Sequence, residues 1–181
     1  MESIVNFIKT NNIEIFTGAE IGVYIGTDAE YFLENISTMK LMYLIDPYIN
    51  YTDVIFKGTI LDNEKVDYNI FGKDLMENPL EAKEMASIKL NRFNDRIKWI
   101  EKMFELCSKE DISNILDFIY IDGNHQYNYV KKDIELARQF VRKGGVISGH
   151  DYVLGGVRRA VDEIDECFND GAFWWFVNKQ G

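Results

Sequence analysis

The amino-acid sequence predicts an α/β protein with a Rossmann-like, doubly wound and mostly parallel sheet that carries helices on both faces. Short apolar runs alternate with helical patterns five times along the chain, the order of elements that builds a parallel sheet. Two of these runs, at residues 116–121 and 146–148, end abruptly in ionisable side chains and are separated by one amphipathic helix pattern. Neighbouring parallel strands deliver such residues to the same edge of a sheet.

The length and composition fit a single domain, residues 1–181, in which 46% of the residues are hydrophobic. The net charge of −10 repels phosphate backbones and disfavours a nucleic-acid partner. A membrane partner is not expected, because the sequence has no run of about 18 apolar residues. The first residues also lack the plan of a signal peptide. We therefore expect a cytoplasmic protein whose cysteines, Cys107 and Cys167, are reduced.

The first part of the chain has two strand patterns, each placed after a helical one. The expected elements are a helix at 2–12, a strand at 18–23, a helix at 28–36 and a strand at 41–45. Thr27 or Asp28 is the expected N-cap of the second helix. Pro47 ends the second strand, because proline cannot continue a central ladder.

Residues 48–78 have the weakest periodicity and are rich in Tyr, Asn and Asp. A connection of this length is more often a lid or binding loop than filler, so we expect a lid-like insert. Elements alternate again after it, with helices at 80–94, 102–109, 127–142 and 156–168, and strands at 96–100, 116–121, 146–148 and 173–177. Residues 143–145 are expected to cap the helix at 127–142. Trp174 and Trp175 are expected to pack the last strand.

The first strand-to-helix turn, residues 20–26, combines an acid with two glycines. Gly22 and Gly26 let a ligand approach the backbone, and the following helix begins with free N–H groups. Asp46 lies about 20 residues further on, where an acid can bind both hydroxyls of a ribose. These features favour a cofactor that contains a nucleoside. The spacing G-x-x-x-G replaces G-x-G-x-x-G, which disfavours NAD and FAD and favours a ligand with a charged amino-acid tail.

The two strands at 116–121 and 146–148 place Asp122, His150 and Asp151 at the ligand-binding edge of the predicted sheet. The chain has only two histidines, and His125 also follows a strand end rather than lying on an apolar face. Structural roles stay open for each. A histidine could cap a helix or bond a loop, Asp122 could serve only as charge before the next helix, and Asp151 could anchor the loop at Tyr152.

These motifs resemble those of the class I S-adenosylmethionine-dependent methyltransferases. The similarity is greatest to the small-molecule O-methyltransferase branch that includes macrocin-type sugar O-methyltransferases. It runs in order through residues 20–26, 44–48, 117–125 and 144–152, and the last two segments are the most specific. Tyr24 departs from the family pattern, which has a glycine at this position.

The resemblance implies that the chain binds S-adenosylmethionine. The cofactor-binding residues would be Glu20, Gly22, Val23, Tyr24, Gly26, Asp46, Lys102, Met103 and Asp122. The first turn would hold the methionine part and Asp46 the ribose hydroxyls. Lys102 and Met103 would lie near the adenine, and Asp122 would lie between the cofactor and the acceptor.

The related metal-dependent enzymes carry a divalent ion on acids at the ends of the fourth and fifth strands. Asp122, His150 and Asp151 match those ligands by position. Oxygen ligands suit Mg²⁺, and an imidazole admits Mn²⁺. The ion would orient the acceptor hydroxyl and lower its pKa, with His125 or His150 accepting the proton. A metal-free site in which Asp122 touches only the cofactor stays open.

The expected reaction is methyl transfer from S-adenosylmethionine to a hydroxyl of a small molecule, most simply a sugar or other glycan. Two alternatives stay open. A nucleotide-cofactor oxidoreductase would need an unusual phosphate cradle, and a non-catalytic module would keep only the cofactor-binding fold. The chain could also be one domain of a larger protein or form a homo-oligomer.

Overall fold

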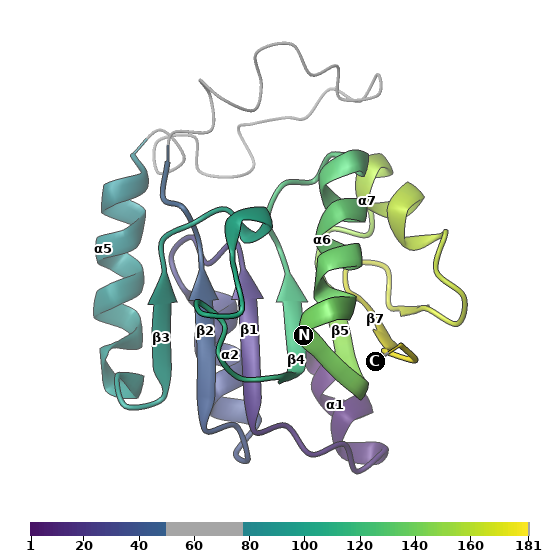
Figure 1. Ribbon diagram of the computed structural model, residues 1–181, viewed down its shortest axis with the longest axis horizontal. Helices are drawn as coiled ribbons and strands as arrows, with labels where there is room; N and C mark the ends of the chain where they lie inside the picture. The colour runs from purple at the N-terminus through teal and green to yellow at the C-terminus, as the bar shows by residue number, and fades with distance from the viewer. Residues whose placement is uncertain (50–77, 181) are drawn as a thin grey trace.

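The computed structural model describes residues 1–49 and 78–180 and confirms the doubly wound α/β fold (Figure 1). One sheet has the strand order β3-β2-β1-β4-β5-β7-β6. The strands from β3 to β5 are parallel, whereas β7 runs antiparallel to β5 and to β6. The expected lid-like insert at 48–78 falls almost entirely outside the described residues.

The elements have the following bounds. The strands are β1 (Thr17–Ile21), β2 (Leu41–Ile45), β3 (Ile97–Ile100), β4 (Leu116–Ile121), β5 (Val141–Gly149), β6 (Phe168–Asn169) and β7 (Trp174–Val177). The helices are α1 (Glu2–Thr10), α2 (Thr27–Asn35), α5 (Pro79–Leu90), α6 (Tyr127–Phe140) and α7 (Gly155–Val161). Short 3-10 turns occur at η2 (Asn91–Phe93) and η3 (Phe104–Leu106).

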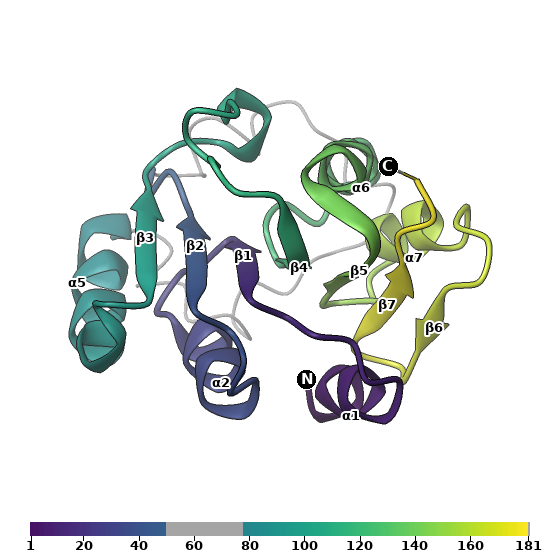
Figure 2. The same ribbon diagram turned by 60° about the horizontal axis from the view of Figure 1, so that its bottom comes forward.

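Helices cover the two faces of the sheet separately (Figure 2). On the face of α1, α2 and α5, the ring of Phe32 packs between Phe118 and Tyr120 of β4. On the face of α6 and α7, the apolar core includes Ile119 and Ile147. Every residue of β4 is therefore buried, which explains why the strand is apolar except for Asp117.

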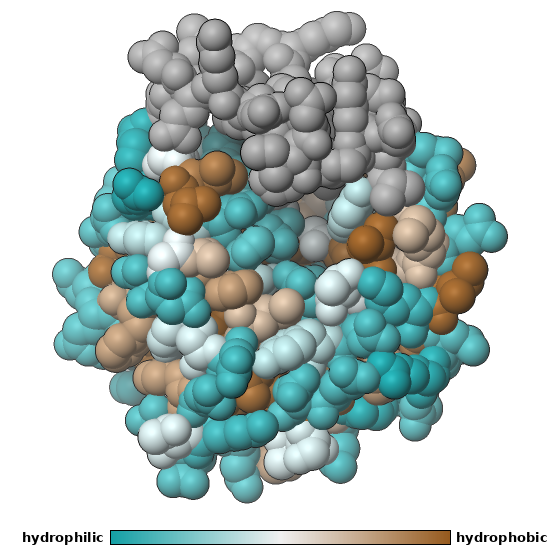
Figure 3. Space-filling model, turned by 180° about the vertical axis from the view of Figure 1, so that it is seen from behind, coloured by the Kyte–Doolittle hydropathy of each residue, from teal (hydrophilic) through white to brown (hydrophobic). Residues whose placement is uncertain are grey.

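The outer surface is mostly polar, as expected for a folded protein with an apolar core. On the side opposite to that of Figure 1, hydrophilic residues predominate and the apolar ones form small separate groups (Figure 3). Trp174 and Trp175 are 1% and 8% exposed, so both pack the last strand as predicted. Within the described ranges, no helix combines the length and apolar character that a bilayer crossing requires.

The register of the parallel strands brings their carboxyl ends together at one edge of the sheet. Ile21 at the end of β1 lies beside Ile45 of β2 and Ile121 of β4, and Ile121 lies beside Gly149 of β5. The residues that follow these four strand ends therefore share one rim, as the sequence predicted.

The turn after β1 depends on left-handed backbone at three residues, with φ of 82° at Gly22, 49° at Tyr24 and 74° at Gly26. Gly26 is the N-cap of α2, so the prediction of Thr27 or Asp28 was wrong. Both residues lie in the first turn of the helix, where the Asp28 carboxylate faces the positive end of the helix dipole.

The strand β5 begins much earlier than predicted. It follows α6 directly at Val141, so residues 143–145 do not form the expected helix cap. Gly144 has a φ of 81°, and a Cβ on Gly145 would lie 2.7 Å from the carbonyl oxygen of Asp117. The glycines therefore let the strand bend and approach β4 closely, at the point where the β4–β5 register shifts.

Two of the expected helices are much shorter than their sequence patterns. The prediction at 102–109 is reduced to the single turn η3, because the carboxylate of Asp111 accepts bonds from the backbone N–H and hydroxyl of Ser108 and holds a loop there. The helix predicted at 156–168 ends at Val161, and the carboxylate of Asp162 accepts a hydrogen bond from the hydroxyl of Tyr152.

Asp117 anchors the start of β1 to β4, and this role can be tested. Its carboxylate accepts the backbone N–H groups of Phe16 and Thr17 at 2.8 and 2.9 Å and the Nε of Arg142 at 2.5 Å. Asp117→Ala leaves these donors unpaired, so we expect it to lower the free energy of unfolding in urea by about 2 kcal/mol or more. The exposed Asp165→Ala is the control and should change it by less than about 0.5 kcal/mol. Equal effects of the two variants would contradict this role.

Candidate functional site

Three side chains from the ends of β4 and β5 converge at the shared rim of the sheet. The Nε2 atom of His125 lies 3.3 Å from Oδ1 of Asp122 and 3.0 Å from Oδ2 of Asp151. One ligand atom from each of these residues lies within 4.8 Å of the others, a spacing that suits a metal ion. Asp122, His125 and Asp151 form what we call the carboxylate–histidine cluster.

His150 lies beside this cluster rather than within it. Its Nδ1 atom is 3.7 Å from Oδ2 of Asp122 and 3.6 Å from Oδ1 of Asp151, too far for hydrogen bonds. The ring stacks on Phe173 with a centroid distance of 4.7 Å, and Trp174 Nε1 donates to the backbone oxygen of His150. The geometry therefore favours His125 over the predicted His150 as third ligand and leaves His150 as the neighbouring imidazole.

The backbone holds the cluster in place. Asp122 N donates to Ile21 O at 2.8 Å, and His150 N donates to Ile121 O at 3.2 Å. Asp151 has a φ of 54°, which an aspartate tolerates better than most residues. Such backbone strain is concentrated at functional sites.

Two of the structural alternatives do not match the side-chain contacts. His125 does not cap α6, because its Nε2 lies against Asp122 and Asp151, and Asn124 rather than His125 accepts the N–H of the N-cap residue Gln126. The hydroxyl of Tyr152 donates to Asp162, and not to Asp151.

The cluster changes the pKa values of its members strongly. Burial by itself lowers the pKa of His125, but the carboxylates of Asp122 and Asp151 outweigh it and raise that pKa to about 9. Burial raises the pKa of Asp122, and both histidines outweigh it, so that pKa is lowered. The nearby carboxylate of Asp122 is the main reason why the pKa of His150 is raised. Without a metal, His125 is therefore a cation at neutral pH.

The first turn lies directly against this cluster. A Cβ on Gly22 would lie 2.1 Å from the backbone oxygen of Asp122, so only glycine fits between the two loops. Glu20 is 1% exposed, and its Oε2 atom has no hydrogen-bond partner in the described part of the chain. Burial first, and then Asp28, Asp122 and other acids, raise the pKa of Glu20 well above its usual value. A buried acid with one oxygen left unpaired suits a positively charged ligand group.

Asp46 has an additional contact that the sequence did not reveal. Its Oδ2 accepts the N–H of Tyr24 at 3.0 Å and its Oδ1 accepts the N–H of Tyr48 at 2.8 Å. The hydroxyl of Tyr48 donates to the backbone oxygen of Tyr24. Asp46 therefore holds the first turn in addition to lying where a ribose would bind. Tyr48 lies in the matching segment 44–48 but was not predicted as a site residue, because its bonds to Asp46 and Tyr24 depend on the folded turn.

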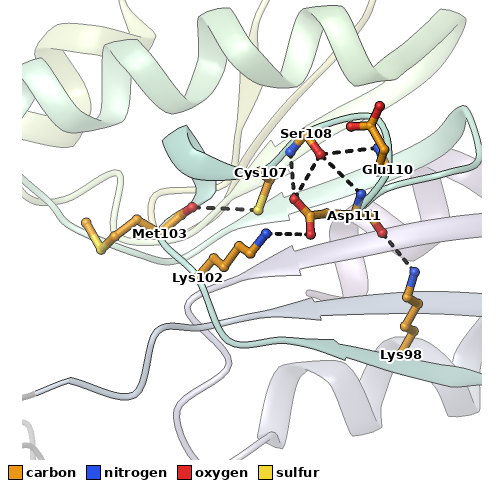
Figure 4. Close-up of polar contacts among 7 residues, drawn as sticks. All are labelled: Lys98, Lys102, Met103, Cys107, Ser108, Glu110 and Asp111. Atoms are coloured by element: carbon orange, nitrogen blue, oxygen red, sulfur yellow. Dashed lines mark hydrogen bonds and ion pairs between the residues drawn. The ribbon is translucent and has the colours of Figure 1, made fainter.

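The turn after β3 contains Lys102 and Met103, as Figure 4 shows. Lys102 Nζ donates to Oδ1 of Asp111 at 2.6 Å, and Cys107 Sγ contacts the backbone oxygen of Met103. Lys102 and Met103 both line a pocket that also reaches Gly22 and Pro47, next to Asp46. The structure thus brings the predicted adenine, ribose and methionine regions to one side of the rim.

Comparison with known proteins defines the class. The sequence profile of a methyltransferase domain family matches residues 19–152, the segment that contains the first turn, Asp46 and the whole carboxylate–histidine cluster. This match covers well over half of the chain, so the chain belongs to this methyltransferase domain family.

One curated relative is similar over most of the chain. Uncharacterized protein R132 of Acanthamoeba polyphaga mimivirus is 26% identical over 152 residues, which cover 84% of this chain and 57% of that protein. The chain thus spans little more than half the length of this curated relative.

Solved structures share the fold. The O-methyltransferase NovP superposes with a TM-score of 0.70 at 16% identity, over 98% of this chain and 77% of NovP. The O-methyltransferase from Bacillus cereus in complex with SAH gives a TM-score of 0.61 at 16% identity, over 99% and 82%. Identities this low support the common fold alone.

The charge of His125 should be visible in the pH dependence of stability. A pKa raised from 6.5 to about 9 contributes stability that is complete below pH 6.5 and is lost as the pH rises towards 9. We therefore expect His125→Gln to destabilise the metal-free protein more at pH 6 than at pH 9.5. The difference should be about 1–2 kcal/mol, because the side chain is about one third exposed to screening solvent. Urea unfolding in EDTA measures it, and a difference that does not change with pH would contradict the assigned charge.

Proposed function

We propose that the chain transfers the methyl group of S-adenosylmethionine to a hydroxyl of a small molecule, in a reaction assisted by a divalent metal. The observation that carries this proposal is the contact between Gly22 and the backbone of Asp122. It sets the glycine turn, where the methionine part would lie, directly beside the carboxylate–histidine cluster. Family membership supports methyl transfer in general, and a sugar or glycan acceptor remains the finer part of the proposal.

The first turn and its surroundings fit the cofactor. Glu20 offers an unpaired carboxylate oxygen, and the acids Asp28 and Asp122 add to the negative field around it. A methionine ammonium and a sulfonium are both cations, so this field favours them. When bound, the cofactor supplies an electrophilic methyl group. The protein then has to align the acceptor oxygen with that methyl, and alignment alone can remove about 7–11 kcal/mol of barrier.

The same field opposes ionisation of an acceptor hydroxyl. A hydroxyl next to Asp122 and Asp151 would have a raised pKa, because like charges disfavour the anion. Asp122, His125 and Asp151 offer two carboxylates and one imidazole, a set that suits Mn²⁺ or Mg²⁺. When bound there, the ion supplies Lewis-acid stabilisation of the acceptor oxygen.

His150 then accepts the hydroxyl proton. Its Nδ1 faces the carboxylates of Asp122 and Asp151, and their negative charge stabilises the protonated ring. Both of these contacts are made by Nδ1, and Nε2 is the other ring nitrogen. Phe173 stacks on the ring and restricts its orientation. The assignment of His125 to the metal and His150 to the proton separates two roles that one nitrogen cannot perform together.

The compartment and assembly are further parts of the proposal. Cys107 and Cys167 are both free thiols, which supports the cytoplasm as the location. The single-domain organisation over residues 1–181 and the formation of a homo-oligomer stay predictions.

The experiment that tests the proposal is incubation with labelled S-adenosylmethionine and a panel of sugars, glycans and phenols, with and without EDTA. We expect methylated product with at least one hydroxyl acceptor, loss of turnover in EDTA, and recovery with Mg²⁺ or Mn²⁺. Turnover that is indifferent to EDTA would contradict the metal role. Calorimetric binding of NAD in place of S-adenosylhomocysteine would favour the oxidoreductase alternative.

Asp122→Asn should reduce methyl transfer at least 100-fold, because Asp122 borders both the cofactor and the proposed ion. The exposed Asp165→Asn is the matched control and should keep the wild-type rate. A normal rate in Asp122→Asn, with unchanged thermal unfolding, would place the reaction centre elsewhere.

Metal binding should release a proton and tighten as the pH rises. His125 is protonated below its pKa of about 9, and an imidazole must be neutral to bind a metal through Nε2. We therefore expect the affinity for Mn²⁺ to rise from pH 6 to pH 8, and calorimetry in buffers of different ionisation enthalpy to show proton release. His125→Gln should remove the pH dependence, and Asp151→Asn should weaken binding. An affinity that is constant over this range would contradict His125 as a ligand.

A further inference from the structure

A pocket separate from the carboxylate–histidine cluster lies between the tips of β1, β2 and β4, the turn after β3 and helix α6. Its walls include the apolar side chains of Ile45, Met103 and Phe104. Two polar side chains to which neither the sequence analysis nor the proposed reaction assigns a role, Asn124 and Asp133, also line it. The pocket is therefore lined by both apolar and polar side chains.

Asn124 presents an unused donor. Its side-chain oxygen accepts Gln126 N at 2.9 Å, which fixes the orientation of the amide. Its Nδ2 atom is buried and has no hydrogen-bond partner among the described residues. A buried N–H group without a partner is uncommon in a folded protein, and a ligand acceptor is one way to satisfy it.

Asp133 presents an unused acceptor on α6. A Cβ on Gly123 would lie 3.8 Å from Oδ2 of Asp133, so the carboxylate lies against the loop that follows β4. No side-chain hydrogen bond or ion pair joins it to any described residue. Burial, and then the neighbouring Glu105, raise its pKa to about 7. The carboxylate is thus half-buried and unpaired among the described residues, and a ligand N–H group would give it a partner.

We propose that Asn124 and Asp133 select the base of the cofactor, with the Asn124 amide donating to N1 of adenine and the Asp133 carboxylate accepting from the 6-amino group. This proposal rests on the proposed function. Adenine presents an amino donor beside a ring acceptor, and the pocket presents the complementary pair. A 6-oxopurine such as hypoxanthine presents an acceptor and an N–H donor in their place, which leaves both residues unmatched.

The position of the pocket agrees with a nucleoside bound along the rim. Ile45 and Pro47, which line it, flank Asp46, the residue expected at the ribose. The ammonium of Lys102 bonds to Asp111, so its charge is already paired (Figure 4). The base-selecting pair comes from the loop after β4 and from α6, whereas the sequence had placed adenine contacts only after β3.

The experiment compares S-adenosylhomocysteine with S-inosylhomocysteine by calorimetry in EDTA, so that neither a metal nor turnover contributes. We expect the wild-type protein to prefer the adenine ligand at least tenfold. Asp133→Asn should bind it at least tenfold more weakly and lose most of the preference. Asn124→Asp keeps the oxygen that accepts Gln126 N but replaces the donor, and should shift the preference towards the inosine ligand. Glu135→Gln removes one charge from the exposed side of α6 and should behave as wild type.

The outcomes separate this inference from the proposed function. Binding of S-adenosylhomocysteine with no preference over the inosine ligand, or a preference unchanged in Asp133→Asn and Asn124→Asp, would overturn the base-selecting pair and leave methyl transfer intact. Failure of the wild-type protein to bind S-adenosylhomocysteine would overturn both. Thermal unfolding of each variant confirms that it is folded, and Asn124→Asp provides an independent test if Asp133→Asn is unstable.

Discussion

The close approach of two loops, one after β1 and one after β4, is the constraint on which the rest of the site depends. Gly22 has no room for a side chain against the backbone oxygen of Asp122, and Asp122 N bonds to Ile21 O. β1 and β4 are hydrogen-bonded neighbours in register up to Ile21 and Ile121, so their tips cannot separate without breaking the sheet. The glycine turn and the carboxylate–histidine cluster are thereby fixed relative to one another by the most buried part of the fold.

Charge gives this rim its chemical character. Glu20, Asp28, Asp122 and Asp151 concentrate acidic side chains in a chain whose net charge is already −10. The two histidines, His125 and His150, lower the pKa of Asp122 against the effect of burial. The rim is consequently suited to cationic ligands and opposed to anionic ones.

The parallel sheet could be predicted from the sequence, because apolar runs such as 116–121 end in polar residues and the strand ends of a parallel sheet share an edge. It also located Asp46, Asp122 and Asp151. Three features escaped it because they depend on tertiary contacts. The early start of β5 reflects the space left at Gly145 by β4, and the loss of the helix at 102–109 reflects bonds to Asp111. The place of His125 between two carboxylates requires the β5 loop, which no local pattern reveals.

Because β7 is antiparallel to β5, a separate part of the chain forms one side of the rim. Because β7 runs against β5, its beginning lies where β5 ends, and Phe173 just before it reaches the ring of His150. A parallel strand would have needed a crossover to deliver a residue there. The aromatic side of the rim therefore belongs to a C-terminal hairpin that shares no loop with the glycine turn or Asp46. Substitutions in this hairpin can therefore change the aromatic side of the rim for a different acceptor, while the glycine turn and Asp46 stay the same.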